Sequence, residues 1–122
     1  MTAEVKRSVR VAERLKEELA ELLVHELRDP RAAGVIVTRV EMPSDLRSAK
    51  VYFRLLEGAE REERREEALQ GLGRAAGLLR REVTRRLQLR HAPELRFVYD
   101  GGLEKLQRID ELLFEIRQEQ SV

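Results

Sequence analysis

Residues 74–90 read RAAGLLRREVTRRLQLR and carry six arginines in seventeen positions. Apolar residues recur at three- and four-residue steps through this stretch and just upstream of it, which is the pattern of one buried helix face. That apolar stripe comprises Leu69, Leu72, Ala76, Leu79, Val83 and Leu87. On a helical projection Arg74, Arg81 and Arg85 lie opposite the stripe, and Arg80 and Arg86 lie on its flanks. The stretch therefore predicts a helix that packs on one side and presents arginine on the other.

Three glycines, Gly71, Gly73 and Gly77, interrupt this helical pattern. Each costs roughly 1 kcal/mol relative to alanine inside a helix, so their presence needs a reason. A kink, a close approach by a partner, or close packing of one helix on another would each supply one. We expect a bend at Ala75-Ala76-Gly77, with packing as the alternative.

The sequence on either side of this helix predicts three strands and two more helices. Downstream, Pro93 ends the helix, residues 94–100 (ELRFVYD) alternate as a strand, and a last helix is striped by Leu106, Ile109, Leu113 and Ile116. Upstream, the central helix begins near residues 60–62. Before it, residues 34–42 and 49–55 predict an antiparallel hairpin, because the link between them is short and has turn chemistry.

The first helix carries the apolar stripe Ala12, Leu15, Leu19, Leu22, Leu23 and Leu27, and Asp29-Pro30 is expected to end it. In the strand at 49–55 apolar residues alternate with Lys50, Tyr52 and Arg54, which suits a sheet covered on one face only. The fold class predicted is α+β, a three-stranded sheet with helices on one face. We expect a single domain over residues 1–122, ordered from about residue 5 to 118.

The formal net charge of +1 conceals a strongly uneven distribution. Residues 1–16 hold five basic and two acidic residues, residues 74–91 hold six and one, and residues 94–122 hold four and seven. A molecule polarised in this way can bind a polyanion on one face while staying neutral as a whole. Solvated helix faces without a partner would give the same uneven charge distribution, so the sequence leaves both interpretations open.

The residues give little support for an enzyme or a metal protein. Cysteine is absent, and His25 and His91 lack the helical partner that a metal site would use. The carboxylates lie in solvated runs from which no catalytic pair stands out, and no phosphate-binding glycine loop follows a strand. No signal peptide or membrane-spanning run is visible, so we expect a cytoplasmic protein without a membrane partner.

Binding is the function class that remains. Arginine-rich helix faces contact phosphates well, because the guanidinium offers paired donors in a fixed geometry. Only five aromatic residues occur, and Tyr52 is the one candidate for stacking on a base. We therefore expect contacts to nucleic-acid backbone more than to base sequence. The alternative is a protein-interaction module whose basic surface docks an acidic partner.

The chain resembles the bacterial ribosome-binding factor A family over nearly its whole length. The resemblance is carried by RSVRVAERLKEELAELL (7–23), LRDPR (27–31), VTRVEMPSDLRSAKVYF (37–53) and ALQGLGRAAGLLRREVTRRLQLRHAPELRFVYD (68–100), in this order and spacing. It implies a type II KH-like domain with a C-terminal helix. In RNA-binding KH domains a GxxG loop between two helices clamps the nucleic-acid backbone. This family has an Ala-x-Gly kink instead, and Ala75-Ala76-Gly77 occupies that place.

The resemblance also implies a function. Members are non-catalytic assembly factors that bind free, immature 30S subunits, contact 16S rRNA near its 5′-terminal helix, and assist late maturation and 16S rRNA processing. It implies a monomer without a cofactor, a role in cold adaptation, and possible release by a ribosome-associated GTPase. By position, the rRNA-binding residues would be Arg74, Arg80, Arg81, Arg85, Arg86 and Arg90, with Lys6, Arg7, Arg10 and Lys50 as weaker candidates. Two departures stand out: Gly101-Gly102 replaces a more polar pair, and the C-terminus is short.

Overall fold

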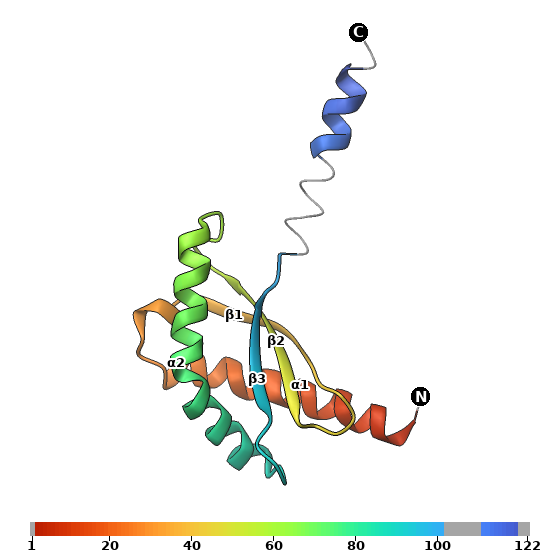
Figure 1. Ribbon diagram of the computed structural model, residues 1–122, viewed down its shortest axis with the longest axis vertical. Coiled ribbons are helices and arrows are strands. Elements are labelled where there is room, and N and C mark those ends of the chain that lie inside the picture. Colours follow the sequence, from red (N-terminus) through yellow and green to blue (C-terminus); the bar gives the residue numbers. More distant parts are fainter. Residues whose placement is uncertain (1, 102–110, 120–122) are drawn as a thin grey trace.

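The computed structural model describes residues 2–101 and 111–119 (Figure 1). Its elements are α1 (Ala3–His25), the short 3₁₀ helix η1 (Pro30–Ala32), β1 (Val35–Glu41), β2 (Ser48–Leu55), α2 (Glu62–Leu87) and β3 (Glu94–Tyr99). Residues 111–119 form a further helix, all of whose residues are exposed. The α+β class and the order of helices and strands are confirmed.

The three strands form one sheet in the order β1-β2-β3. β1 and β2 are antiparallel, as the short link between them predicts, and β3 pairs with β2 in parallel. A parallel pair needs a long crossover, and α2 supplies it. In β2 the residues Ala49, Val51, Phe53 and Leu55 are buried, while the residues between them stay at least partly exposed. One face of the sheet therefore carries the core, and the other faces outward.

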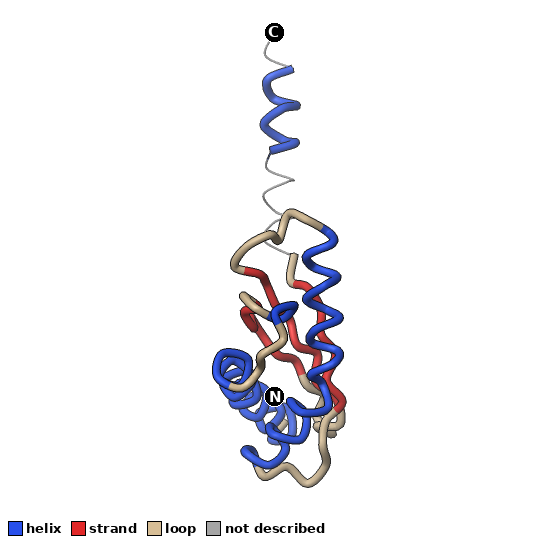
Figure 2. The backbone as a smooth tube through the Cα atoms, turned by 90° about the vertical axis from the view of Figure 1, so that its left-hand side faces the viewer, coloured by secondary structure: helices blue, strands red, loops and turns tan. Residues whose placement is uncertain are grey.

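The two long helices cover the core face of the sheet and cross each other at a steep angle (Figure 1). Leu15, Leu19 and Leu22 of α1 are fully buried against Val51 and the buried side of α2. Seen from the side, α2 runs alongside the strands (Figure 2). Helices and sheet thus share an apolar core made of two clusters, which partly buried residues such as Phe97 contact in common, and the outward sides of both helices remain available to partners.

The ends of α1 differ in part from the prediction. The helix begins after Thr2, whose hydroxyl accepts a hydrogen bond from the backbone N–H of Val5 at 3.3 Å. It ends at His25, four residues before the expected stop. Asp29 instead caps η1, because its carboxylate accepts the backbone N–H of Arg31 at 2.9 Å. The Asp-Pro pair starts a new turn of helix here.

The buried stripe of α2 differs from the prediction at two positions in its first half. Ala68 and Ala75 are buried, whereas Leu69, predicted to be in the stripe, is 38% exposed. Ala76 is only half-buried. Neighbouring positions both fall within the broad apolar arc of a helix, so periodicity alone does not separate them. Leu72 and the second half of the predicted stripe, Leu79 to Leu87, are confirmed as buried.

α2 is a single helix where the sequence predicts two segments. Helical geometry continues through Ala75, Ala76 and Gly77 without a break. Figure 1 shows the axis of α2 changing direction along its length, and a kink at these three residues stays a prediction. Of the last predicted stripe, Leu106 and Ile109 lie outside the described residues, and Leu113 and Ile116 are each 48% exposed.

Candidate nucleic-acid interface

The outward side of α2 carries a row of three arginines, Arg74, Arg81 and Arg85, which we call the outer row. All three are exposed and lie opposite the buried stripe, as predicted. Arg85 pairs with Glu82 at 2.8 Å, yet its side chain remains 70% exposed. Within the described part of the chain, the side chains of Arg74 and Arg81 make no hydrogen bond or ion pair, although their charges help to lower the pKa of Asp29 and of Glu82, respectively. The outer row is therefore open to an external anion.

The glycines of α2 have two different roles. A Cβ on Gly71 would lie 3.0 Å from the Cβ of Arg31 and 3.1 Å from the backbone nitrogen of Ala32, so this glycine lets η1 pack against α2. A Cβ on Gly73 or Gly77 would meet nothing within 4 Å. Packing within the described chain thus explains Gly71 only. Gly73 and Gly77 leave bare backbone beside the outer row, where a partner can approach closely.

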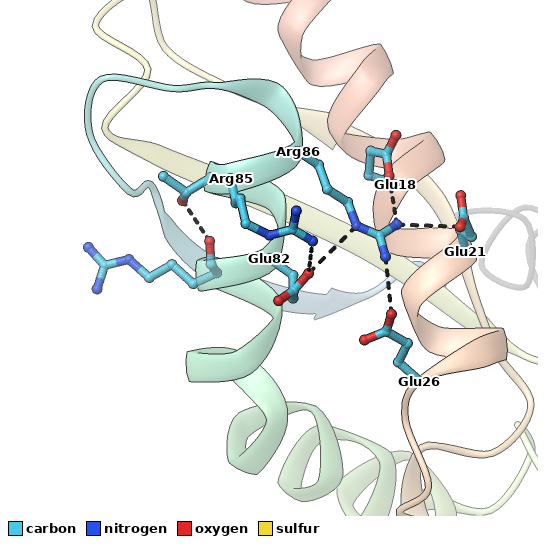
Figure 3. Close-up of polar contacts among 8 residues, drawn as sticks. Glu18, Glu21, Glu26, Glu82, Arg85 and Arg86 are labelled. Atoms are coloured by element: carbon cyan, nitrogen blue, oxygen red, sulfur yellow. Dashed lines mark hydrogen bonds and ion pairs between the residues drawn. The ribbon is translucent and has the colours of Figure 1, made fainter.

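Arg86, predicted to face rRNA, is instead held between the two long helices (Figure 3). Its guanidinium lies 2.9 Å from Glu18, 3.2 Å from Glu26, 3.4 Å from Glu21 and 3.7 Å from Glu82. The side chain is 19% exposed. The hydrogen bond to Glu18 and the charges of the neighbouring carboxylates raise the pKa of the guanidinium further. Arg86 therefore links α1 to α2. Its guanidinium is occupied by these carboxylates, which argues against a direct rRNA contact.

Arg80 also takes part in the fold. Its Nη2 donates a hydrogen bond of 2.8 Å to the backbone carbonyl of Ala92, and its Nε donates a longer one to the same oxygen. These bonds tie the last turns of α2 to the segment that leads into β3. Arg80 is exposed, but both its Nε and its Nη2 are already engaged, whereas Arg85 engages its Nη2, so Arg80 is a weaker candidate than the outer row.

The other predicted contact residues lie in three separate places. Arg7 and Arg90 come together at one cleft, although 83 positions separate them in the sequence. Lys6 and Arg10 lie on a different side of α1, beside Val9. Lys50 is on the outward face of the sheet. The ten predicted residues therefore do not form one continuous surface.

Tyr52, the predicted stacking residue, has one ring face covered. The Arg39 guanidinium carbon lies 3.9 Å from the ring centroid, and the Lys50 amine lies 5.8 Å from it. The hydroxyl donates to a carboxylate oxygen of Glu41 at 3.2 Å. Arg39 had no role in the sequence-based prediction, because only the pairing of β1 with β2 places it opposite Tyr52.

Two other classes of site are absent from residues 2–101 and 111–119. No group of three or more histidine and carboxylate side chains is arranged to hold a metal ion there. Nor does any helix in these ranges combine the length and apolar character needed to cross a membrane.

Comparison with known proteins decides which family this arrangement belongs to. The sequence model of ribosome-binding factor A matches residues 7–113. The chain is 54% identical over 117 residues to ribosome-binding factor A of Sorangium cellulosum, covering 96% of this chain and 94% of that protein. The chain belongs to the ribosome-binding factor A family.

Solved structures of ribosome-binding factor A share the fold. The crystal structure of the Thermus thermophilus protein aligns with a TM-score of 0.66 and 29% identity, covering 75% of this chain and 93% of that one. A homology model of the Thermus thermophilus factor, fitted into a cryo-EM map of a 30S–RbfA complex, aligns with a TM-score of 0.62 and 29% identity. It covers 76% of this chain and 94% of that one. The resemblance inferred from sequence fragments is thus confirmed over most of the ribosome-binding factor A chain.

Proposed function

We propose that this chain is a non-catalytic factor that binds the free, immature 30S subunit and contacts 16S rRNA through its phosphates. The observation that carries the proposal is the outer row, Arg74, Arg81 and Arg85, exposed beside the bare backbone at Gly77. Guanidinium groups bind phosphate with paired donors, and a glycine without a nearby side chain lets a sugar–phosphate strand come close to the helix. Membership of the family and the relative fitted into a 30S complex support the choice of partner.

The finer parts of the proposal come from the family. The factor assists late maturation and processing of 16S rRNA near its 5′-terminal helix, acts as a monomer in the cytoplasm, and leaves the subunit with the help of a GTPase. The outer row suits a transient role, because phosphate contacts are salt-sensitive and carry little base specificity. Three arginines that neutralise three phosphates of a single strand give a slope of log affinity against log salt of roughly −2.

The test is co-sedimentation with purified small subunits and with intact ribosomes at low and moderate salt. We expect binding to free subunits alone, weakening as salt rises. Arg81→Glu with Arg85→Glu should abolish it while the circular dichroism spectrum stays unchanged, because both side chains project away from the core. Arg28→Glu with Arg61→Glu is the matched control, since it makes the same charge change at two exposed arginines outside the site.

Normal binding by the folded Arg81/Arg85 double variant would refute the placement of the interface. Binding to an acidic protein but not to subunits or 16S rRNA would favour the protein-interaction alternative.

A further inference from the structure

An open cleft of about 650 Å³ lies where the beginning of α1 meets the β1–β2 loop and the segment between α2 and β3. Three arginines from these three segments line it, namely Arg7, Arg47 and Arg90, and all three are exposed. Asp45 is the one carboxylate among the lining residues, and His91 is the one histidine. The cleft therefore has an excess of positive charge, contributed by parts of the chain that only the fold brings together.

The walls of this cleft contain unusual backbone. Leu46 has a φ of 59° and Gln88 a φ of 53°, and they are the two residues other than glycine with positive φ in the described part of the chain. Both line the cleft. A left-handed conformation is uncommon for leucine, and such positions concentrate at ligand sites when the surrounding structure holds them in place.

Hydrogen bonds hold both of these wall segments. In the β1–β2 loop, the N–H of Leu46 donates to the carbonyl of Pro43 at 3.0 Å, and the N–H of Arg47 donates to the Asp45 carboxylate at 3.0 Å. At the end of α2, the N–H of Gln88 donates to the carbonyl of Arg85 at 3.2 Å. The loop is thus folded before any ligand arrives, which lowers the entropy lost on binding.

Besides the polar residues Ser44 and Gln88, the lining has an aliphatic part that includes Val11, Leu87 and Leu89. A nucleotide combines a phosphate with a flat ring that has little charge, and the cleft offers a basic rim beside an apolar wall. Its volume falls within the range of about 300–1,000 Å³ typical of ligand sites. A carboxylate side chain of a peptide would satisfy the rim but would leave the apolar wall uncovered.

We propose that this cleft binds one unpaired nucleotide of the rRNA, with its phosphate against Arg7, Arg47 and Arg90 and its base against the aliphatic wall. The inference rests on the proposed function and deepens it, because it adds a second place of contact and identifies a nucleotide as the group bound there. The outer row leads toward this cleft, since Arg85 lies three residues before Gln88. One phosphate in the cleft beside the three at the outer row would steepen the salt slope for single-stranded RNA from roughly −2 to roughly −3.

The first experiment measures binding of a fluorescein-labelled, single-stranded RNA heptamer by anisotropy, with a glutamate-rich peptide of equal length for comparison. Arg47→Glu is the informative variant, because Arg47 lies outside the outer row and its backbone, not its side chain, makes the loop hydrogen bond. We expect about tenfold weaker RNA binding and a salt slope less steep by about 1. The control Arg28→Glu should stay within about twofold of the unaltered protein.

A second experiment locates the RNA on the protein. Titrating the heptamer into methyl-labelled protein should shift the NMR signals of Leu46 and Leu89 on binding. Equal affinities for Arg47→Glu and Arg28→Glu, methyl shifts confined to α2 before Arg85, or tighter binding of the peptide than of the RNA would each overturn the inference.

Co-sedimentation with small subunits distinguishes a failure of the cleft proposal from a failure of the proposed function. If the unaltered protein binds subunits and Arg47→Glu binds them equally well, the cleft is refuted and the proposed function stands. If the unaltered protein binds no subunits under any salt condition, the proposed function itself fails.

Discussion

Alanine substitution of the three glycines of α2 should change stability in opposite directions. At Gly73 and Gly77 an added methyl group meets nothing within 4 Å, so only the helix propensity changes. Alanine is better than glycine in a helix by about 1 kcal/mol, so each substitution should stabilise the domain by about that amount. At Gly71 the same gain is offset, because the methyl group would lie 3.0 Å from the Cβ of Arg31 and 3.2 Å from its carbonyl carbon.

The net effect at Gly71 follows from the cost of overpacking. Forcing an extra methyl group into a packed contact costs about 1–3 kcal/mol, which leaves Gly71→Ala between roughly neutral and about 2 kcal/mol destabilised. Thermal unfolding followed by circular dichroism checks this, because 1 kcal/mol shifts Tm by about 4 °C in a domain of this size. Gly77→Ala should therefore unfold several degrees higher than the unaltered protein, and Gly71→Ala lower than Gly77→Ala.

The same series also tests function. Gly77→Ala should weaken subunit binding despite its added stability, because the methyl group narrows the approach to the backbone beside Arg74 and Arg81. Equal stabilisation at Gly71 and Gly77 would refute the tight contact with η1. A loss of stability at Gly77 would refute the open helix surface there, and unchanged binding by a stabilised Gly77→Ala would remove the functional reason for this glycine.

Three further predictions concern charge and backbone. Arg86→Met should lower Tm more than Arg81→Met, because only Arg86 neutralises four carboxylates, and equal shifts would contradict that role. The hydrogen bond from Arg85 lowers the pKa of Glu82, so its stabilising contribution is present above the ordinary value of 4.5 and is lost as pH falls through the lower folded value. Urea unfolding between pH 7 and pH 3 should accordingly show a weaker acid dependence in Glu82→Gln than in the unaltered protein. Gln88→Gly should stabilise the domain by about 0.5 kcal/mol, because glycine adopts the left-handed cap of α2 at no steric cost, and a lower urea midpoint would contradict this.

The sequence predicts most of the fold because the apolar periodicities are strong. Alternation over residues 49–55 and four-residue steps from Leu79 to Leu87 each identify a buried face that the structure confirms. The prediction is wrong where one sequence pattern is compatible with two neighbouring structural assignments. Ala68 and Leu69 both lie within the apolar arc of α2, and only the packing of η1 and Phe53 on that end of the helix selects the smaller residue. Asp29-Pro30 is a stop signal for one helix and equally a start signal for another.

The candidate site is harder to predict from the sequence. Whether an arginine is available to a partner depends on residues that are distant in the sequence and close in the fold. The helical projection places Arg81 opposite the apolar stripe and Arg86 on its flank, but it does not show that α1 and its C-cap bring three glutamates to Arg86. Arg47 was not among the predicted contact residues, because it lies in a short turn that contains no other arginine. Its relation to Arg7 and Arg90 depends on the meeting of three segments at one end of the sheet.

Arg86 links the two long helices, whereas the outer row faces outward, so an arginine variant can lose subunit binding for two different reasons. Arg86 balances four carboxylates, and one of them, Glu82, also pairs with Arg85 of the outer row, so removal of Arg86 would leave uncompensated negative charge beside the proposed interface. An Arg86 variant should then bind subunits less well, although Arg86 is not among the proposed RNA contacts. Its salt slope separates the two mechanisms, because the slope counts phosphates neutralised by direct contact and a distant repulsion removes none of them. Loss of affinity with an unchanged slope identifies the structural arginine, and loss of affinity with a less steep slope identifies an arginine of the interface.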